Sequence, residues 1–366
     1  MQNQSTTRRS FLATAGASSL FLPNLLLGKK GSEEQIIVGT GEYQFEAVHD
    51  WAKLPEKYTW QTTHNLAVDQ AGFVYVIHEG RKQLTDHPSI FVFDPDGRFV
   101  RAFGTQFQGG GHGIEVRKEG NEEFLYVCAY QNIKAFAKLT LTGEVVWEKY
   151  APMESGVYKA GEDKKESVRF TGKGRPRWGR DAFLPTNFAF LKDGGFLLSD
   201  GYGSFWIHRY DKDGKWLSKF GGPGKGEGTF QTPHGIWVDD RNGKETVVIC
   251  DRARHTVQFL DLEGAHLHTL EGFGLPANAD TWNDLLMIPE LHARISLLDK
   301  SNQVVARLGD DVENVVTKKN VSRGNSKTWK AGKFVHPHDA CFSPQGDIFV
   351  AEWVQTGRIS KLKRIS

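Results

Sequence analysis

Short stretches in which apolar and polar residues alternate recur along the chain, and turn sequences such as Asp-Gly and Asn-Gly separate them. Residues 185–221 contain four such stretches, and residues 233–270 repeat their order. An alternation with a period of two, rich in Val, Ile, Phe and Trp, indicates β-strands rather than helices. Each copy therefore predicts a small antiparallel sheet.

Four further segments follow the same pattern, which makes six copies: residues 64–104, 112–148, 276–309 and 337–364. The residues that open the first strands are His64, His112, Thr186, His234, Ala277 and His338, with spacings of 48, 74, 48, 43 and 61 residues. A base period of 43–48 residues with four strands per copy is typical of a β-propeller. We therefore expect an all-β fold, a six-bladed β-propeller.

The two longer spacings reflect insertions at about residues 149–184 and 310–335. Each insertion runs into a first strand, and loops of this length are usually functional or disordered. We expect them to cap one mouth of the central channel and to influence which ligand enters.

The last copy stops after three strands, whereas the segment Gln35–Phe45 (QIIVGTGEYQF) precedes the first copy and reads as a strand. We predict that this segment supplies the missing outer strand and closes the ring. Closure removes exposed strand edges, which otherwise favour aggregation. Residues 32–366 then form one domain, although 366 residues alone would suggest two or three.

Residues 1–31 read as a twin-arginine export signal, because Arg8 and Arg9 precede Phe-Leu and a run of small and apolar residues. Pro23 and Asn24 interrupt that run, so a stable membrane span is not expected. This predicts a periplasmic or extracellular protein, either free or anchored by an uncleaved signal.

Composition narrows the possible functions. Hydrophobic residues make up 39% of the chain and the mean hydropathy is −0.45, which excludes a disordered chain and a membrane bundle. The formal net charge of +2 offers no electrostatic case for binding nucleic acid. The three cysteines, an odd number, predict no disulfide framework. We expect a monomer that binds a small-molecule or peptide-derived substrate in its channel.

Histidine occupies the same first-strand position in four copies, at His64, His112, His234 and His338. First strands line the channel of a propeller, and the second, fourth and sixth blades lie about 120° apart around its axis. His112, His234 and His338 would then converge, as in a catalytic zinc site with an open fourth position. Other divalent metals of similar preference fit as well. His64 is a fourth ligand or a supporting group, and the alternative is that the histidines only fill the channel.

An acidic residue ends the second strand of most copies, and we expect these acids to hold turns through backbone hydrogen bonds: Glu79, Asp200, Asp251, Glu290 and Glu352. The residues just after them vary more, so we place function there. The candidates are Arg81, Tyr202, Arg252, Arg254 and Trp353. A tyrosine can act as a base beside a metal, and an arginine can bind a carboxylate through two hydrogen bonds.

The units resemble NHL repeats, and residues 60–366 are similar to the lyase domain of peptidylglycine α-amidating enzymes. The similarity rests on GGHGIEV, SDGYGSFWIHRYDKDGKWLSKFG, TPHGIWV, CDRARHTVQFLD and HPHDACFSPQGDIFVAEW. The resemblance implies zinc held by His112, His234 and His338, and cleavage of a peptidyl α-hydroxyglycine into an amide and glyoxylate. It also implies active-site roles for Tyr202 and Arg252.

A structural calcium is implied too, bound by Asp339 and the main-chain oxygen of Ile114. Three departures stand against the family pattern. Glu79 replaces a family arginine, for which Arg81 is the nearest substitute; His336 replaces a methionine; and Gly203 replaces a disulfide cysteine.

Three functions therefore remain open. The first is a zinc-dependent lyase in which Tyr202 is the base and Arg252 orients a carboxylate. The second is a non-catalytic NHL propeller that binds a peptide, glycan or protein and holds a structural metal. The third is a calcium-dependent lactonase-like hydrolase, against which three channel histidines argue.

Overall fold

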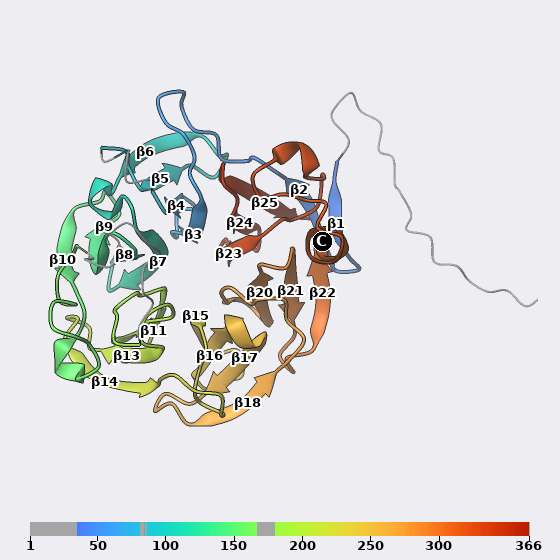
Figure 1. Ribbon diagram of the computed structural model, residues 1–366. Coiled ribbons are helices and arrows are strands. Elements are labelled where there is room, and N and C mark those ends of the chain that lie inside the picture. Colours follow the sequence, from blue (N-terminus) through green and yellow to red (C-terminus); the bar gives the residue numbers. More distant parts are fainter. Residues whose placement is uncertain (1–34, 81–83, 85, 167–179, 366) are drawn as a thin grey trace, which may run out of the picture. The chain divides into compact units, whose positions relative to one another are not determined.

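The computed structural model describes residues 35–80, 84, 86–166 and 180–365. In this part of the chain the strands form six antiparallel sheets arranged in a ring (Figure 1), which confirms the predicted six-bladed β-propeller. The first strand of each sheet faces the axis of the ring and the last strand lies at the rim.

The first five blades each contain four strands in chain order. Blade 1 contains β3 (Thr63–Val68), β4 (Val74–His78), β5 (Ile90–Phe93) and β6 (Phe99–Phe103). Blade 2 contains β7 (Gly111–Glu119), β8 (Glu122–Tyr130), β9 (Lys134–Thr140) and β10 (Val145–Lys149). Blade 3 contains β11 (Asn187–Phe190), β12 (Phe196–Ser199), β13 (Trp206–Tyr210) and β14 (Trp216–Gly221). Blade 4 contains β15 (Pro233–Asp239), β16 (Thr246–Asp251), β17 (Thr256–Leu260) and β18 (His266–Leu270). Blade 5 contains β19 (Asp280–Trp282), β20 (Leu285–Glu290), β21 (Arg294–Leu298) and β22 (Val304–Leu308).

Blade 6 combines both ends of the described chain. Its inner strands are β23 (Pro337–Phe342), β24 (Ile348–Glu352) and β25 (Arg358–Arg364), and β2 (Tyr43–Val48) pairs with β25 in antiparallel register. The N-terminal segment therefore closes the ring, as predicted.

The predicted extent of the closing strand differs from the structure. Only the last three residues of Gln35–Phe45 belong to β2, and β1 (Ile37–Thr40) adds a fifth strand outside it. The cause is local. Gly39 has a φ of +86°, and a Cβ there would lie 1.9 Å from the carbonyl oxygen of Tyr43, so this glycine permits the chain to fold back as a hairpin.

Apolar side chains fill the spaces between neighbouring blades. The cluster between blades 1 and 2 joins Tyr75 and Ile77 to Ile114 and Val127. The cluster between blades 5 and 6 includes Phe45 of the closing strand. Each blade thus buries its two faces against its neighbours, which explains why a single copy of the unit would not be stable alone.

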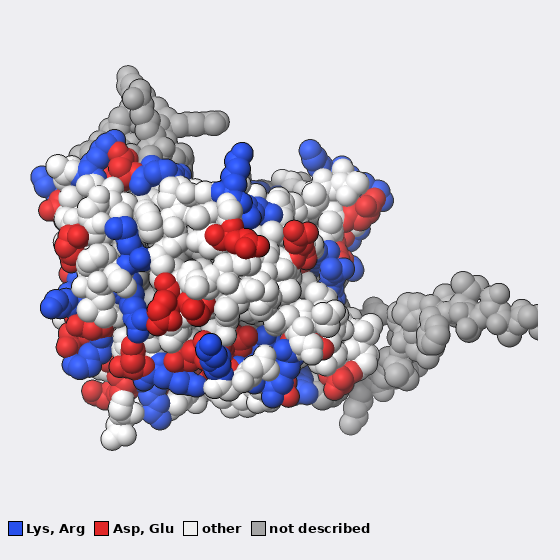
Figure 2. Space-filling view, turned by 90° about the horizontal axis from the view of Figure 1, so that it is seen from below, with Lys and Arg blue, Asp and Glu red and all other residues white. Residues whose placement is uncertain are grey.

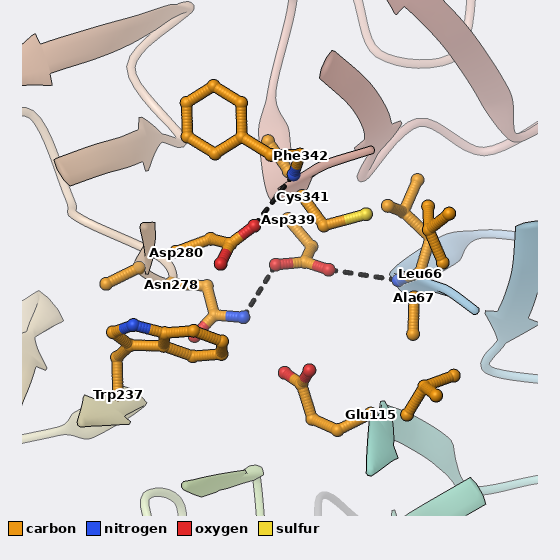
Figure 3. A pocket seen from close by; sticks show the side chains of 13 residues that line it. Leu66, Ala67, Glu115, Trp237, Asn278, Asp280, Asp339, Cys341 and Phe342 are labelled. Atoms are coloured by element: carbon orange, nitrogen blue, oxygen red, sulfur yellow. Dashed lines mark hydrogen bonds between the residues drawn. The ribbon is translucent and has the colours of Figure 1, made fainter. Parts of the chain in front are cut away.

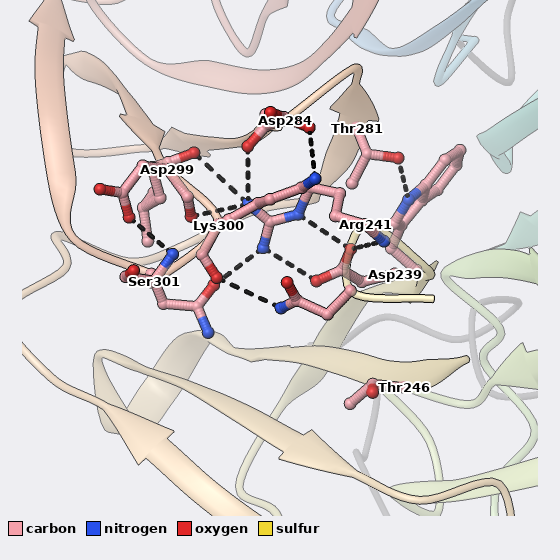
Figure 4. Close-up of polar contacts among 12 residues, drawn as sticks. Asp239, Arg241, Thr246, Thr281, Asp284, Asp299, Lys300 and Ser301 are labelled. Atoms are coloured by element: carbon pink, nitrogen blue, oxygen red, sulfur yellow. Dashed lines mark hydrogen bonds and ion pairs between the residues drawn. The ribbon is translucent and has the colours of Figure 1, made fainter. Parts of the chain in front are cut away.

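Polar contacts also join blades. Arg241, which follows β15, donates to the carboxylate of Asp239 and to Asn302 Oδ1, and its Nη1 donates to the main-chain oxygen of Asp299 at 2.8 Å (Figure 4). This buried guanidinium is matched by acceptors from blades 4 and 5, so its desolvation is compensated.

The visible surface in Figure 2 carries acidic and basic side chains that are interspersed. Within the described residues, no helix is long and apolar enough to cross a membrane. All three cysteines are free. The predicted export signal, residues 1–31, lies outside the described residues, and so do Arg81 and residues 167–179 of the first insertion.

Ring closure can be tested at Phe45, whose side chain is only 3% exposed in β2. Phe45→Ala should lower the free energy of unfolding by about 3–5 kcal/mol, because it removes a buried ring from the seam between blades 5 and 6. Val48→Ala in the same strand is the control, since Val48 is 39% exposed. Urea denaturation of both variants measures the effect. Equal losses would contradict a closing role for β2.

Candidate metal centre

Each of the four axial histidines lies at a β-bulge in the first strand of its blade. The pairing of β3, β7, β15 and β23 with the next strand shifts register across His64, His112, His234 and His338, respectively. A bulge leaves one residue out of the ladder and re-aims its side chain. The local structure therefore turns all four imidazoles toward the axis, where they are at most 3% exposed.

The four imidazoles meet at one point. The ring centroid of His112 lies 4.8 Å from those of His64 and His234 and 5.1 Å from that of His338. Ring nitrogens of His64, His112 and His338 lie within 4.8 Å of one another. The structure thus brings together every histidine that the repeat analysis selected.

Three of the imidazoles make equivalent hydrogen bonds to the main chain. Nδ1 of His112, His234 and His338 donates to the carbonyl oxygen at the equivalent repeat position of the next blade, namely that of Thr186, Ala277 and His64, at 2.8, 2.6 and 2.7 Å. A carbonyl oxygen only accepts, so Nδ1 carries the proton and Nε2 keeps its lone pair. This is the tautomer and the support that metal-binding histidines require.

The Nε2 atoms of two of these rings lie close together. Nε2 of His112 and Nε2 of His234 are 3.1 Å apart. Two unprotonated nitrogens cannot bond to one another, whereas two ligands of a tetrahedral zinc at 2.0–2.1 Å would be separated by about 3.3 Å. Nε2 of His338 is buried and has no hydrogen-bond partner within the described part of the chain. The spacing and the unpartnered nitrogen both suit a shared cation.

Burial also sets the protonation state of these rings. Desolvation lowers the pKa of His112, His234 and His338 well below the usual value of 6.5, and the charge of Arg252 acts in the same direction on His234 and His338. The three rings are therefore neutral near pH 7, the form in which imidazole binds metals.

His64 differs from the other three. Its two ring nitrogens are buried and make no hydrogen bond to the described residues. Its Nε2 lies 3.6 Å from Glu79 Oε2, which is too long for a hydrogen bond. His64 therefore lacks the main-chain support of its three neighbours and has no locked tautomer.

Tyr202 and Arg252 lie beside the histidines, as the resemblance implies. The ring of Tyr202 is 5.4 Å from His112 and 5.1 Å from His234, and Arg252 Nη1 donates to its hydroxyl oxygen at 2.7 Å. Burial raises the pKa of Tyr202, while the Arg252 guanidinium acts in the opposite direction.

Arg252 is a buried cation with unused donors. Its Nε and Nη2 have no hydrogen-bond partner among the described residues, and its exposed fraction is 8%. A buried guanidinium with unpaired N–H groups is costly unless an anion binds there. Arg254 instead donates to the carbonyl oxygens of Gly226 and Thr229, so its role is structural.

The acids that end the second strands behave as expected in four blades. The carboxylates of Asp200, Asp251, Glu290 and Glu352 accept backbone N–H groups of the segment that enters the same blade. Glu79 is different, because it accepts from the side chain of Gln131 and faces His64. Four acids therefore hold turns, and Glu79 belongs to the site.

A second polar cluster lies further along the same first strands. Asn278 Nδ2 donates to Asp339 Oδ1 at 2.6 Å, and the backbone N–H of Leu66 donates to Asp339 Oδ2 at 2.9 Å (Figure 3). Glu115 and Asp280 border the same cavity, whose volume is about 110 Å³. Burial raises the pKa of Asp280 to about 7, that of Asp339 to about 6, and that of Glu115 well above its usual value.

Two axial asparagines contact this cluster: Asn278 borders the cavity, and Asn187 Nδ2 donates to Glu115 Oε1 at 3.1 Å. Asn65, Asn187 and Asn278 follow the opening residue in blades 1, 3 and 5, and Asp339 has that place in blade 6. The Oδ1 atoms of the three asparagines are buried and find no hydrogen-bond partner in the described chain. The apolar side chain of Ile114, the other residue that the resemblance assigns to calcium, packs between blades 1 and 2, and Ile114 is not among the residues that border the cavity.

Comparison with solved structures shows the fold of this chain. It shares the fold of virginiamycin B lyase from Staphylococcus aureus, with 13% identity, a TM-score of 0.51, and coverage of 88% of this chain and 100% of that one. A gluconolactonase from Xanthomonas campestris is similar at 11% identity and a TM-score of 0.52, with 87% and 89% covered. A Bacteroides thetaiotaomicron protein of unknown function has 12% identity and a TM-score of 0.53, with 90% and 76% covered.

No protein-family model and no curated protein sequence matches the chain. The comparisons therefore support a six-bladed propeller whose fold occurs in a lyase and in a lactonase. The finer resemblance to NHL repeats and to amidating lyases rests on the motifs alone.

Sequence reasoning missed Glu115 and Asp280 of the second polar cluster and several residues near the histidines. Tyr130, whose ring is 4.7 Å from His112, ends the second strand of blade 2, where the other blades have an acid. The position of Tyr130 in the repeat could have identified it as a candidate site residue. The same holds for Asn65, Asn187 and Asn278. Arg323, which lies on the ring of Trp353, belongs to an insertion, where no repeat position exists to mark it.

The buried carboxylates predict a specific dependence of stability on pH. The pKa of Asp280 is raised from 3.8 to about 7 on folding, so its contribution is complete below pH 4 and is lost as the pH rises to 7. We expect the free energy of unfolding of chelator-treated protein to fall over that range, by up to about 4 kcal/mol from this group.

Asp280→Asn should flatten this pH dependence, whatever its effect on absolute stability. Asp284→Asn is the control, because the Asp284 side chain is 72% exposed in the same blade. Urea denaturation at several pH values measures both slopes. An Asp280→Asn slope equal to that of the wild type would show that Asp280 does not titrate in this way.

Proposed function

We propose that the protein is a zinc-dependent lyase that cleaves a substrate of the α-hydroxyglycine type at the histidine end of the propeller axis. The observation that carries this proposal is the shared arrangement of His112, His234 and His338. Each ring is neutral and buried, and its Nδ1–H donates to the next blade, so its Nε2 is left to bind a metal.

The donor set fits zinc. Three imidazole nitrogens suit Zn²⁺, whereas Ca²⁺ and Mg²⁺ prefer oxygen ligands. Three protein ligands leave a fourth position for a substrate oxygen. When bound there, zinc would polarise the substrate hydroxyl and lower its pKa.

The chain's own residues account for the remaining chemistry. The hydroxyl group of an N-acyl-α-hydroxyglycine loses its proton to Tyr202 Oη, a carbonyl forms at the carbon, and the bond from that carbon to the amide nitrogen breaks. The amide nitrogen then takes this proton from Tyr202 Oη, which regenerates the base, so the products are an amide and glyoxylate, and no co-reactant is consumed. Arg252 supports this role for Tyr202, since its hydrogen bond at 2.7 Å stabilises the phenolate.

The acidic end of the axis is proposed to hold a structural calcium. The candidate ligands are the carboxylates of Asp339, Glu115 and Asp280 and the main-chain oxygen of Ile114. Three buried carboxylates without a matched cation are unfavourable, and hard oxygen donors are the ligands that Ca²⁺ prefers. The cavity, of about 110 Å³, accepts an ion and a few waters. Calcium should abolish the pH-dependent loss of stability described above.

We also propose that residues 1–31 direct export by the twin-arginine route. This route carries folded proteins, and it would place the enzyme in the periplasm or outside the cell with its metals already bound.

Metal content and activity together test the lyase proposal. Protein purified without chelator should contain about one zinc per chain, and metal-loaded protein should release glyoxylate from α-hydroxyhippurate. His234→Ala should lose the zinc and lower the rate at least about 100-fold. His336→Ala is the matched control, because His336 lies outside the four-histidine cluster and its Nδ1 donates to the main-chain oxygen of Leu291.

Zinc that persists in His234→Ala would show that the three-blade site is wrong. A zinc-loaded wild type that releases no glyoxylate would contradict the reaction while leaving the metal site intact.

His64 supports a second candidate function, a non-catalytic propeller with a closed metal site. Its ring centroid lies 4.7 Å from that of His338, close enough for His64 to be a fourth ligand. The visible spectrum of cobalt-substituted protein separates the two functions. The lyase requires an open position, so azide should change the wild-type spectrum. If azide changes only the spectrum of His64→Ala, the site is closed in the wild type and the binding function is favoured.

A further inference from the structure

The second insertion is folded against blade 6 and presents one arginine to the histidine end of the axis. Trp329 Nε1 donates to the carbonyl oxygen of Ser322 at 2.7 Å, and the backbone N–H of Gln355 donates to the carbonyl oxygen of Arg323 at 3.0 Å. The guanidinium of Arg358 lies 4.8 Å from the ring of Trp329. These contacts hold the backbone on both sides of Arg323.

The guanidinium of Arg323 lies on the face of Trp353, with Cζ 3.2 Å from the ring centroid. Stacking of this kind leaves the N–H groups in the plane of the guanidinium available. Its Nε is buried and has no hydrogen-bond partner among the described residues. The ion pairs of the described chain include none with Arg323.

Arg323 and Arg252 lie at the same end of the axis. Arg323 stacks on Trp353, which follows the second strand of blade 6, and Arg252 follows the second strand of blade 4. Both guanidinium groups interact electrostatically with the phenol of Tyr130, whose ring lies 4.7 Å from His112 and 5.0 Å from Tyr202. The carboxylate of Glu79 also interacts electrostatically with the Arg323 guanidinium. Two arginines and one glutamate leave an excess of one positive charge beside the neutral histidines.

We propose that Arg323 is a specificity-determining residue that, together with Arg252, recognises a free carboxylate on the substrate. The inference rests on the proposed lyase function and adds Arg323 as a second residue, beside Arg252, that binds the free carboxylate of the substrate. It also explains how a chain with Glu79 at this position supplies a second arginine, which comes from the insertion.

The chemistry of the site favours a carboxylate over other anions. A guanidinium edge matches the two oxygens of a planar carboxylate. The excess of one positive charge suits a monoanion, and Glu79 would repel the second charge of a phosphate.

Binding of hippurate tests the proposal without requiring the reaction, because hippurate has the carboxylate but lacks the hydroxyl group that would be cleaved. Calorimetry on zinc-loaded protein should show that Arg323→Met weakens hippurate binding at least about tenfold, as expected for a lost hydrogen bond to a charged group. Hippurate methyl ester should bind wild type and variant equally. Lys327→Met removes the same charge from an exposed residue of the same insertion and should bind hippurate like the wild type.

Arg323→Lys keeps the charge without the planar edge and should also weaken binding, which provides a second variant if Arg323→Met folds poorly. Equal hippurate affinity in wild type and both Arg323 variants would overturn the proposal, and so would a wild type that does not bind hippurate.

Kinetics with α-hydroxyhippurate separate this inference from the proposed function. Arg323→Met should raise KM at least about tenfold and leave kcat within about twofold, because the arginine binds the carboxylate and does not touch the reacting bond. If the wild type binds hippurate through Arg323 but releases no glyoxylate, the lyase function fails and carboxylate recognition stands. If the wild type releases glyoxylate and Arg323→Met leaves KM unchanged, the role of Arg323 fails and the lyase function stands.

Discussion

The arrangement of the axis depends on one repeated hydrogen bond, in which an imidazole Nδ1–H donates to the main-chain carbonyl oxygen at the equivalent repeat position of the next blade. His112, His234 and His338 each make it. The bond joins neighbouring blades and sets the tautomer of the ring at the same time. The bond from His338 to His64 crosses from blade 6 to blade 1, beside the blade that β2 completes at the rim. Ring closure and the geometry of the candidate metal centre are therefore linked.

Charge is distributed unevenly along this axis. The histidine end combines neutral imidazoles with the unpaired donors of Arg252, and the next residues along the first strands form a cluster of buried carboxylates. His338 and Asp339 are adjacent in β23, so one strand contributes to both ends. Nitrogen donors at one level would select zinc and oxygen donors at the next would select calcium, so the type of ligand atom rather than the size of the site would distinguish the two metals.

One repeat position serves two purposes around the ring. In blades 3 to 6 the acid that ends the second strand accepts backbone N–H groups and holds the entering segment. In blade 1 Glu79 instead accepts from the side chain of Gln131 and faces His64. In blade 2 Tyr130 replaces the acid and contacts His112. The propeller thus keeps its structural acids in blades 3 to 6 and varies this position in blades 1 and 2, where the residue contacts an axial histidine.

Local sequence alone determined the six blades, the first-strand position of the histidines and the use of an N-terminal strand for closure. These features follow from alternation, turn residues and repeat phase, which are properties of short segments. The hairpin of β1 and β2 was not predicted. It depends on Gly39, which has a positive φ and lies too close to the carbonyl oxygen of Tyr43 to carry a side chain. Only the tertiary structure decided that Glu79 does not hold a turn as the other acids do. It also decided that Glu115 and Asp280 border the same cavity as Asp339, and that Arg323 stacks on Trp353. These residues occupy unequal positions in the repeat or lie outside it, so packing between blades brings them together and no local pattern records it.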